Sequence, residues 1–251
     1  MERHDRTPVA TFFAESAIAP AEPIVLGEAA AHHARVKRLA IGDPVVVTNG
    51  AGTRGVGEIA ALDRQRLTVR IGPTTEIPRP SPIHLCAPVA DRDRMLWLAE
   101  KATELGVASW RAVRFRRSMS VSPRGEGSAF TEKVRARMQS ALEQSGGAWM
   151  PEILPDVPVD SLTLGDEQMG MLLDAGGEPI GELAPQSPLR EPLVLIGPEG
   201  GIEPAERERL LAAGWVPVRL APATLRFETA GIAALAVLRA SSLRTTGDMH
   251  G

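Results

Sequence analysis

The strongest constraint on the fold is a change of pattern between residues 72 and 82. Before this segment, short apolar stretches alternate with turn residues, which is typical of the strands of a small β-barrel. After it, apolar strands alternate with helices, which indicates a parallel α/β sheet. The segment itself holds four prolines and few apolar residues, so we interpret it as a linker. We therefore predict two domains, residues 1–72 and 83–251, joined by a linker over residues 73–82.

The expected elements follow from the period of the apolar residues. In the first domain we expect a helix over residues 28–40 and strands at 23–26, 43–48, 55–59 and 67–71. In the second domain we expect strands at 83–87, 110–115, 169–173, 193–196 and 216–220. Its helices are expected over 92–105, over 130–144, from near Pro204 to Gly214, and over 229–242. Glycines just after three of these helices are expected to end them.

The composition excludes several classes of protein. Of 251 residues, 43% are hydrophobic and 24% charged, which is the balance of a globular chain rather than a disordered one. No apolar run approaches the roughly 18 residues of a membrane span, and the N-terminus lacks a signal-peptide core, so we expect a cytoplasmic protein. The single Cys86 and five scattered histidines have no metal-ligand spacing. We therefore expect no metal.

Any nucleic-acid site would have to be a local patch, because the formal net charge is −3 and gives no overall attraction to phosphates. Two stretches are basic and free of interleaved acids. The first lies in the expected helix over residues 28–40 and contains His32, His33, Arg35, Lys37 and Arg38. The second covers residues 109–124 and contains Arg111, Arg114, Arg116, Arg117 and Arg124.

A glycine-rich loop, Gly197-Pro198-Glu199-Gly200-Gly201, follows the apolar strand at 193–196 and precedes the helix near Pro204. In an α/β sheet, ligands bind at such strand-to-helix turns, and glycines allow the backbone to approach a ligand closely. The loop matches neither of the usual phosphate-binding patterns. The alternative is an ordinary tight turn.

A second candidate loop lies at residues 220–230, Leu-Ala-Pro-Ala-Thr-Leu-Arg-Phe-Glu-Thr-Ala, between a strand and the last helix. Two loops of this kind can line one crevice. Taken alone, Glu228 or Thr229 could cap the helix and Arg226 could be a surface charge. Together with the glycine loop, these residues favour a ligand site.

Several strings, in a fixed order, resemble the RsmE family, the 16S ribosomal RNA uridine-N3 methyltransferases of the SPOUT class. They are FF at residues 12–13, HHARVKR at 32–38, EKATELGV at 100–107, EQSG at 143–146, GPEGG at 197–201 and LRFETA at 225–230. The resemblance covers nearly the whole chain. It implies a PUA-like RNA-binding β-barrel and a SPOUT α/β methyltransferase domain with a deep trefoil knot. It also implies a homodimer that uses S-adenosylmethionine, without a metal, to methylate 16S rRNA of the small ribosomal subunit.

The resemblance also implies roles for individual residues. Two knot loops and one strand end would hold the methyl donor through Leu173, Ile196, Gly197, Pro198, Glu199, Gly200, Gly201, Leu220, Ala221, Pro222, Ala223, Leu225 and Arg226. RNA would be contacted by His33, Arg35 and Arg38 in the barrel and by Arg92, Arg94, Arg116 and Arg117 in the second domain. Arg226 and Glu228 are the candidate catalytic groups.

The chain departs from the family pattern at several places. Asp91-Arg92 stands where the family usually has Lys-Gly, and Gly147 stands where it usually has Arg. Asp174-Ala175 replaces a frequent His-Glu pair, and Ala221 replaces a glycine of the second loop. These departures concern phosphate contacts and the backbone path beside the cofactor, and they leave the core strings in place.

The chemistry can be reasoned without the family. Methylation of N3 of uridine requires that the imide proton is removed and that the charge on O2 and O4 is stabilised. We therefore predict that Arg226 donates a hydrogen bond to a uracil oxygen, and that Glu228 acts as the general base or orients Arg226. N3 lies on the Watson–Crick edge, so the base must be unpaired or flipped out.

Three other functions stay open at this point. The first is a SPOUT methyltransferase of another specificity, such as ribose 2′-O-methylation. The second is an RNA-binding factor that has lost catalysis, to which the departures give some support. The third is an unrelated α/β nucleotide-binding enzyme, which the missing phosphate-loop lysine disfavours.

Overall fold

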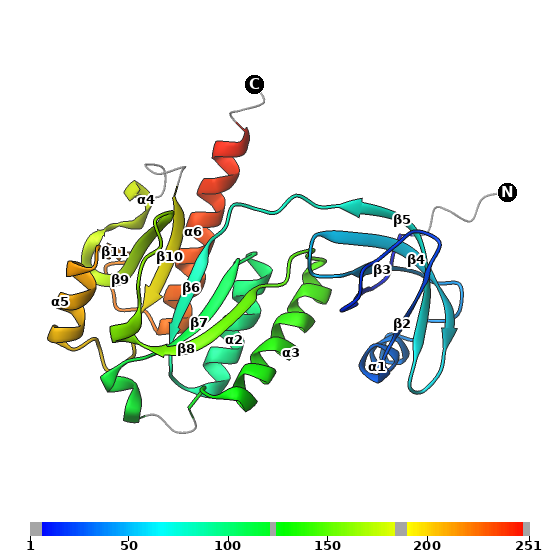
Figure 1. The fold of residues 1–251 in the computed structure, drawn as a ribbon, viewed down its shortest axis with the longest axis horizontal. Coiled ribbons are helices and arrows are strands. Elements are labelled where there is room, and N and C mark those ends of the chain that lie inside the picture. The colour runs from blue at the N-terminus through cyan, green and yellow to red at the C-terminus, as the bar shows by residue number, and fades with distance from the viewer. Residues whose placement is uncertain (1–6, 121–123, 184–189, 248–251) are drawn as a thin grey trace. The chain divides into compact units, whose positions relative to one another are not determined.

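In a computed structural model of the protein, residues 7–120, 124–183 and 190–247 are described, and the chain divides into two compact units (Figure 1). The first unit comprises Met1–Arg79 and Gln139–Met150, and the second comprises Pro80–Met138 and Pro151–Gly251. Each unit has its own sheet.

The first unit is built on a five-stranded sheet in the order β1-β3-β4-β5-β2. Its strands are β1 Thr11–Phe13, β2 Pro23–Leu26, β3 Pro44–Thr48, β4 Thr53–Leu62 and β5 Leu67–Glu76, and its first helix is α1 Glu28–Val36. β1 pairs with β3 in parallel, and the other neighbours are antiparallel. The core is apolar, with Phe12, Val45, Val47, Leu67 and Val69 fully buried. The four expected strands are confirmed, whereas the three-residue β1 was not foreseen.

The expected linker differs from the structure at its start, because β5 continues to Glu76 as a partner of β4. The register shifts where Gly72 and Pro73 lie opposite Val56. A bulge is a place where a strand tolerates proline, because no ladder hydrogen bond is needed from its missing N–H. Residues 73–76 are therefore strand, although their composition indicates a linker.

Residues 139–150 also differ from the expectation, since they were predicted to lie in the second domain and instead pack in the first unit. The N–H of Phe13 donates to Oε1 of Glu143 at 2.9 Å, and the N–H of Gly52 donates to the carbonyl of Ala148 at 2.9 Å. Gly52 leaves the space that the Trp149 ring fills, because a Cβ there would lie 2.5 Å from that ring. These contacts join residues far apart in sequence, so no local pattern could indicate them.

The second unit is a six-stranded sheet in the order β11-β9-β10-β6-β7-β8, in which every pair of neighbours is parallel. Its strands are β6 His84–Pro88, β7 Ser109–Arg114, β8 Glu152–Pro158, β9 Gln168–Pro179, β10 Glu191–Ile196 and β11 Val216–Arg219. Its main helices are α2 Arg92–Glu104, α5 Pro204–Ala212 and α6 Phe227–Gly247. A further helix, α3 Ser128–Ser145, begins in this unit and belongs to the first unit from Gln139 on. Shorter helical segments are η1 Arg116–Ser120, η2 Val159–Ser161 and α4 Ile180–Leu183. The predicted parallel α/β sheet is confirmed, and the edge strand β8, which contains two prolines, was missed.

The helix ends mostly agree with the sequence analysis. Gly106, Gly146 and Gly214 adopt φ of +69°, +67° and +89°, the left-handed conformation that ends a helix. α6 begins at Phe227, two residues before the predicted start. Glu228 and Thr229 therefore lie inside the helix, and the alternative that one of them caps its start is wrong.

Two further observations concern the described residues alone. Within them, no helix is long and apolar enough to cross a membrane. The same ranges contain no group of three or more His, Cys, Asp or Glu side chains that could hold a metal ion, while His4 and His250 lie outside them. The trefoil knot stays a prediction.

Candidate functional site

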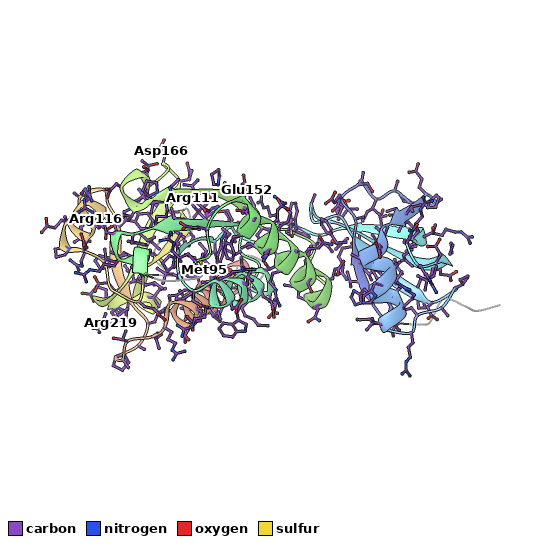
Figure 2. The ribbon with its side chains drawn as sticks, turned by 90° about the horizontal axis from the view of Figure 1, so that it is seen from below. Met95, Arg111, Arg116, Glu152, Asp166 and Arg219 are labelled. Atoms are coloured by element: carbon purple, nitrogen blue, oxygen red, sulfur yellow. The ribbon has the colours of Figure 1, made fainter. Side chains whose placement is uncertain are left out.

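A small pocket lies where β9 and β11 reach the carboxyl edge of the parallel sheet, the edge at which ligands bind in α/β folds. Its volume is about 120 Å³. Its walls are Leu173, Asp174 and Ala175 from β9, Val218 and Arg219 from β11, and Leu220, Ala221, Ala223, Thr224, Leu225 and Ala230 from the following loop and helix. Figure 2 labels Arg219, at the end of β11. The pocket thus brings together Leu173 and four of the predicted cofactor residues of the second candidate loop, Leu220, Ala221, Ala223 and Leu225.

The pocket wall supplied by β9 belongs to a segment, residues 173–177, that leaves the ladder with β11. We call this segment the excursion. Leu172 pairs with Pro217 and Glu178 pairs with Val218, so residues 173–177 lie outside the ladder with β11. The strand returns to the ladder at Glu178, directly after Gly177, where a Cβ would lie 2.4 Å from the backbone of Pro217 and Val218. Only glycine allows this approach. The sequence predicts a strand that ends at Leu173, so Asp174 and Ala175 were not expected as wall residues. Gly176-Gly177 is the signal that could have indicated the excursion.

Asp174 is held from two sides. Its Oδ1 accepts the N–H of Gly176 at 2.9 Å, and its Oδ2 accepts Nε of Arg207, on α5, at 2.7 Å. Burial raises the pKa of this carboxyl, but the hydrogen bonds from Arg207 and Gly176 outweigh burial and lower the pKa below its ordinary value. Asp174 is therefore an ionised, immobilised part of the pocket wall.

The glycine loop follows β10, the neighbour of β9. Gly201 adopts φ +76°, and its N–H donates to the carbonyl of Pro198 at 2.8 Å, so the loop contains a tight turn. Two arginines hold it: Nη1 of Arg94 pairs with Oε1 of Glu199, and Nη1 of Arg117 donates to the carbonyl of Gly200 at 2.9 Å.

The predicted cofactor residues of this loop have different surroundings. Ile196 and Pro198 are buried, whereas Glu199, Gly200 and Gly201 are exposed. None of the residues 196–201 belongs to the described lining of the 120 Å³ pocket. The two arginines that anchor this loop were predicted to contact RNA, and their role in holding the loop was not expected.

The two candidate catalytic residues flank the start of α6. Arg226 is exposed, and its carbonyl accepts the N–H of Ala230 at 2.9 Å. Glu228 is only 7% exposed, and its Oε2 is buried without a hydrogen-bond partner in the described structure. A buried acceptor without a partner costs about 1–3 kcal/mol, so this carboxyl is placed at a cost to stability.

The start of α6 lies against the end of β10. A Cβ on Gly231 would lie 2.8 Å from Cδ1 of Ile196, the last residue of β10, and 2.8 Å from Leu98 on α2. Glu228 is less than one helical turn before Gly231. The buried carboxyl is therefore near the strand end from which the glycine loop starts.

The arginines predicted to contact RNA in the second unit are largely engaged by the protein itself. Besides Arg94 and Arg117, Arg116 lies with Nη1 3.7 Å from Oε2 of Glu203, and its N–H donates to Oε1 of Glu206 at 2.9 Å. Arg116 is exposed at the start of η1 (Figure 2). Arg92 is half-buried in the first turn of α2.

The basic residues predicted to contact RNA in the first unit lie on or just after α1. His33 packs edge-on against Phe12, with ring centroids 5.5 Å apart, and its Nδ1 lies 3.7 Å from Oε2 of Glu143. Nη2 of Arg35 donates to the carbonyl of Arg64 at 3.3 Å. Arg38 is exposed and adopts φ +57°, a left-handed conformation that costs a non-glycine residue about 1 kcal/mol.

Comparison with known proteins identifies both units. A family model described as RNA methyltransferase domain matches residues 77–239, and one described as RNA methyltransferase PUA domain matches residues 26–72. The curated protein "Ribosomal RNA small subunit methyltransferase E" of Mycobacterium tuberculosis is 28% identical over 232 residues, which cover 84% of each chain. The protein of the same name from Bacillus subtilis is 24% identical over 89% of this chain and 92% of its own.

Two solved structures share the fold. A methyltransferase from Legionella pneumophila, in complex with the bound cofactor SAM, has 26% identity and a TM-score of 0.81 over 92% of this chain and 97% of its own. A ribosomal RNA small subunit methyltransferase E from Neisseria gonorrhoeae, bound to S-adenosylmethionine, has 22% identity and a TM-score of 0.82, over 92% of this chain and 96% of its own.

Proposed function

Because the chain belongs to the RNA methyltransferase family, we propose that it transfers a methyl group from S-adenosylmethionine to N3 of a uridine in 16S rRNA. The observation that carries this proposal is the pocket at the carboxyl edge of the second unit, whose lining includes five residues that the family resemblance assigns to the cofactor: Leu173, Leu220, Ala221, Ala223 and Leu225. The rRNA relatives and the SAM-bound neighbour support the substrate and the cofactor.

The residues of the pocket fit one part of the cofactor. Many of its wall residues are small or apolar, among them Leu173, Leu220, Ala221 and Ala223, which suits a nucleoside ring system. The volume of about 120 Å³ is below the roughly 300 Å³ of pockets for whole ligands. We assign it to the adenosine, with Leu173 against the ring.

Bound S-adenosylmethionine supplies an electrophilic methyl group on a sulfonium, and the protein must supply the rest. Arg226 is exposed, and the described residues give its guanidinium no hydrogen-bond or ion-pair partner, so it can donate to O2 or O4 of the uracil as negative charge develops there. The new bond is between N3 and the methyl carbon, and the bond from that carbon to sulfur breaks. Holding N3 in line with the methyl group supplies a further part of the rate.

We assign Glu228 as the general base that removes the proton from N3 of the uridine. Its Oε2 is buried and has no hydrogen-bond partner in the described structure, so this oxygen is available to accept the proton of a bound substrate. Across the described residues no hydrogen bond joins it to Arg226, which favours the role of a base over that of a residue that orients Arg226. The proton passes from N3 to Glu228 and then to solvent.

The first unit is assigned to RNA binding, with His33, Arg35 and Arg38 on or just after α1 as its contacts. The target uridine must be unpaired or flipped out of its helix for N3 to be reached. We place the reaction in the cytoplasm, on the small ribosomal subunit, with a homodimer as the working form. Light scattering tests the dimer.

The test is methyl transfer from labelled S-adenosylmethionine to unmodified small ribosomal subunits and, in parallel, to naked 16S rRNA, followed by nucleoside analysis. We expect 3-methyluridine, with more product from the subunits. A 2′-O-methylated nucleoside would overturn the specificity. Cofactor binding without product from either substrate would favour a non-catalytic RNA-binding factor.

A further inference from the structure

We infer that Arg207, on α5, is a positioning residue for the methyl-donor pocket and acts through Asp174. The inference rests on the proposed function, because it concerns the affinity for S-adenosylmethionine. The pair of Arg207 and Asp174 joins one surface helix to the strand excursion that forms a pocket wall.

The excursion at residues 173–177 has little support from the sheet. Pairing with β10 ends at Leu173, and pairing with β11 is interrupted between Leu172 and Glu178. A backbone segment without ladder hydrogen bonds is free to open locally unless other contacts hold it. Of the side-chain hydrogen bonds among the described residues, the one that reaches the excursion from another element is that of Arg207 to Asp174.

The carboxylate of Asp174 connects Arg207 on α5 with the backbone of the excursion. Oδ2 of Asp174 accepts Nε of Arg207 at 2.7 Å, while Oδ1 accepts the N–H of Gly176 at 2.9 Å inside the excursion. Each carboxylate oxygen thus has a different partner. Fixing the carboxylate from α5 therefore also fixes the path of residues 174–176, and with it the wall made by Leu173 and Ala175.

The helix that carries Arg207 is itself well anchored. Glu203 and Glu206 form a capping box at the start of α5, and Glu206, only 2% exposed, also accepts the N–H of Arg116 at 2.9 Å. Leu210 is buried one turn further on. A side chain that projects from a rigid element places its partner more firmly than one on a loop.

Because the side chains of Arg207 and Asp174 are partly exposed, we expect their pair to affect the pocket more than the global stability of the fold. The side chains of Arg207 and Asp174 are 40% and 22% exposed, and partly exposed pairs of this kind contribute little to folding. An unanchored excursion, however, has to be ordered each time the cofactor binds, and that cost reduces the affinity. Loss of Arg207 should therefore weaken cofactor binding more than it lowers the melting temperature.

The chain offers a matched control on the same helix. Arg209 forms an ion pair with Asp160, with Nη2 2.5 Å from Oδ1, and neither residue lines the pocket. Arg207→Met and Arg209→Met remove the same charge from α5, but Arg207→Met alone releases the pocket wall. A general effect of charge or helix stability would appear in both variants.

The test is calorimetric titration of S-adenosylmethionine into the full-length wild type, Arg207→Met, Arg209→Met, Asp174→Asn and the Asp174→Asn/Arg207→Met double variant. We expect Arg207→Met to raise Kd about threefold to tenfold, and Arg209→Met to change it less than twofold. Once Asp174→Asn is made, adding Arg207→Met should have little further effect, because both act through one contact. In turnover, KM for the cofactor should rise and kcat should stay near that of the wild type.

Three results would overturn the inference. The first is an unchanged Kd in Arg207→Met, and the second is an equal rise in Arg207→Met and Arg209→Met. The third is a fall in kcat with unchanged KM, which would place Arg207 in the chemical step. A wild type that fails to bind S-adenosylmethionine would instead overturn the proposed function, together with this inference.

Discussion

The carboxyl edge of the second unit and the α1 surface of the first unit are both rich in basic residues, but they use them differently. At the carboxyl edge, Arg94, Arg117 and Arg207 are bound to Glu199, to the carbonyl of Gly200 and to Asp174. On and after α1, the side chains of Lys37 and Arg38 are exposed, and the described residues give them no ion-pair partner.

A basic stretch in the sequence can therefore serve two purposes. An arginine already bound to a carboxylate is a poor phosphate ligand, since RNA would have to displace its partner. An exposed and unpaired one is available to phosphates. We therefore expect substitutions at the carboxyl edge to change the cofactor site and substitutions on α1 to change RNA affinity, with Arg226 as the unpaired exception at the carboxyl edge.

The largest effect is expected from Arg226→Ala. Loss of one electrostatic donor to a developing charge typically lowers kcat about 10²–10³-fold, and the affinity for S-adenosylmethionine should change far less. Arg135→Ala is the control, because Arg135 is an exposed arginine on α3 outside the proposed site. The measurement is single-turnover methyl transfer with saturating cofactor. Turnover within a few-fold of the wild type in a folded Arg226→Ala protein would remove Arg226 from the mechanism.

The next largest effect is expected from Gly177→Ala. The added Cβ would meet the backbone of Pro217 and Val218 at 2.4 Å, and such overpacking typically costs about 1–3 kcal/mol. Because β11 would have to move, cofactor affinity should fall as well. Gly181→Ala, on α4, is the control, since among the described residues no atom beyond its chain neighbours and the backbone of its own helix lies within 4 Å of the added Cβ. Denaturant unfolding and cofactor titration measure both effects, and a Gly177→Ala protein that matches Gly181→Ala would contradict the role of the excursion.

A smaller effect is expected from Arg38→Gly on the α1 surface. Glycine relieves the left-handed conformation of residue 38, so stability should rise by about 0.5–1 kcal/mol. RNA affinity should fall at the same time, and the slope of log K against log salt should decrease by about 1. Filter binding of a 16S rRNA fragment at several salt concentrations measures this slope. An unchanged slope would mean that Arg38 contacts no phosphate.

The smallest effect is expected from Glu143→Gln, in the first unit. Burial raises the pKa of this carboxyl, although the hydrogen bond from Phe13 and the nearby His33 partly offset the rise. A raised pKa means that folding disfavours the charged form, so the stability contribution falls as the pH rises through the folded pKa. Glutamine still accepts the N–H of Phe13. At pH 8 the variant should be more stable by less than about 1 kcal/mol, and the difference should vanish near pH 4. A less stable variant at pH 8 would contradict the claim that folding disfavours the charged form of Glu143.

Much of the fold was predictable from local patterns. Local signals span only a few residues and can be recognised in the sequence itself. They include the apolar strand at 193–196, the glycine at the end of each of three helices and the proline at the start of α5. The loop at 220–225 could be assigned to a ligand site for the same reason, because it follows a strand and precedes a helix.

The features that were missed depend on distant partners. Glu143 reaches Phe13 across 130 positions, and Arg94 reaches Glu199 across 105. β8 carries two prolines and is ordered by its pairing with β7 at the edge of the sheet. In the sequence, Asp174-Ala175 is only a departure from the His-Glu pair that is frequent in the family. The structure shows that Asp174 accepts a hydrogen bond from Arg207. Contacts between residues far apart in the chain produce no periodic pattern of apolar residues, so they cannot be predicted from such a pattern.

The most direct test of the central claim is hydrogen exchange of the full-length chain alone, with S-adenosylmethionine, and with a 16S rRNA fragment. We predict that the cofactor protects residues 173–177 and 220–226 and leaves α1 unchanged, whereas the RNA fragment protects residues 28–38. Protection of α1 by the cofactor, or no protection at the carboxyl edge of the second unit, would contradict the division of roles between the two regions.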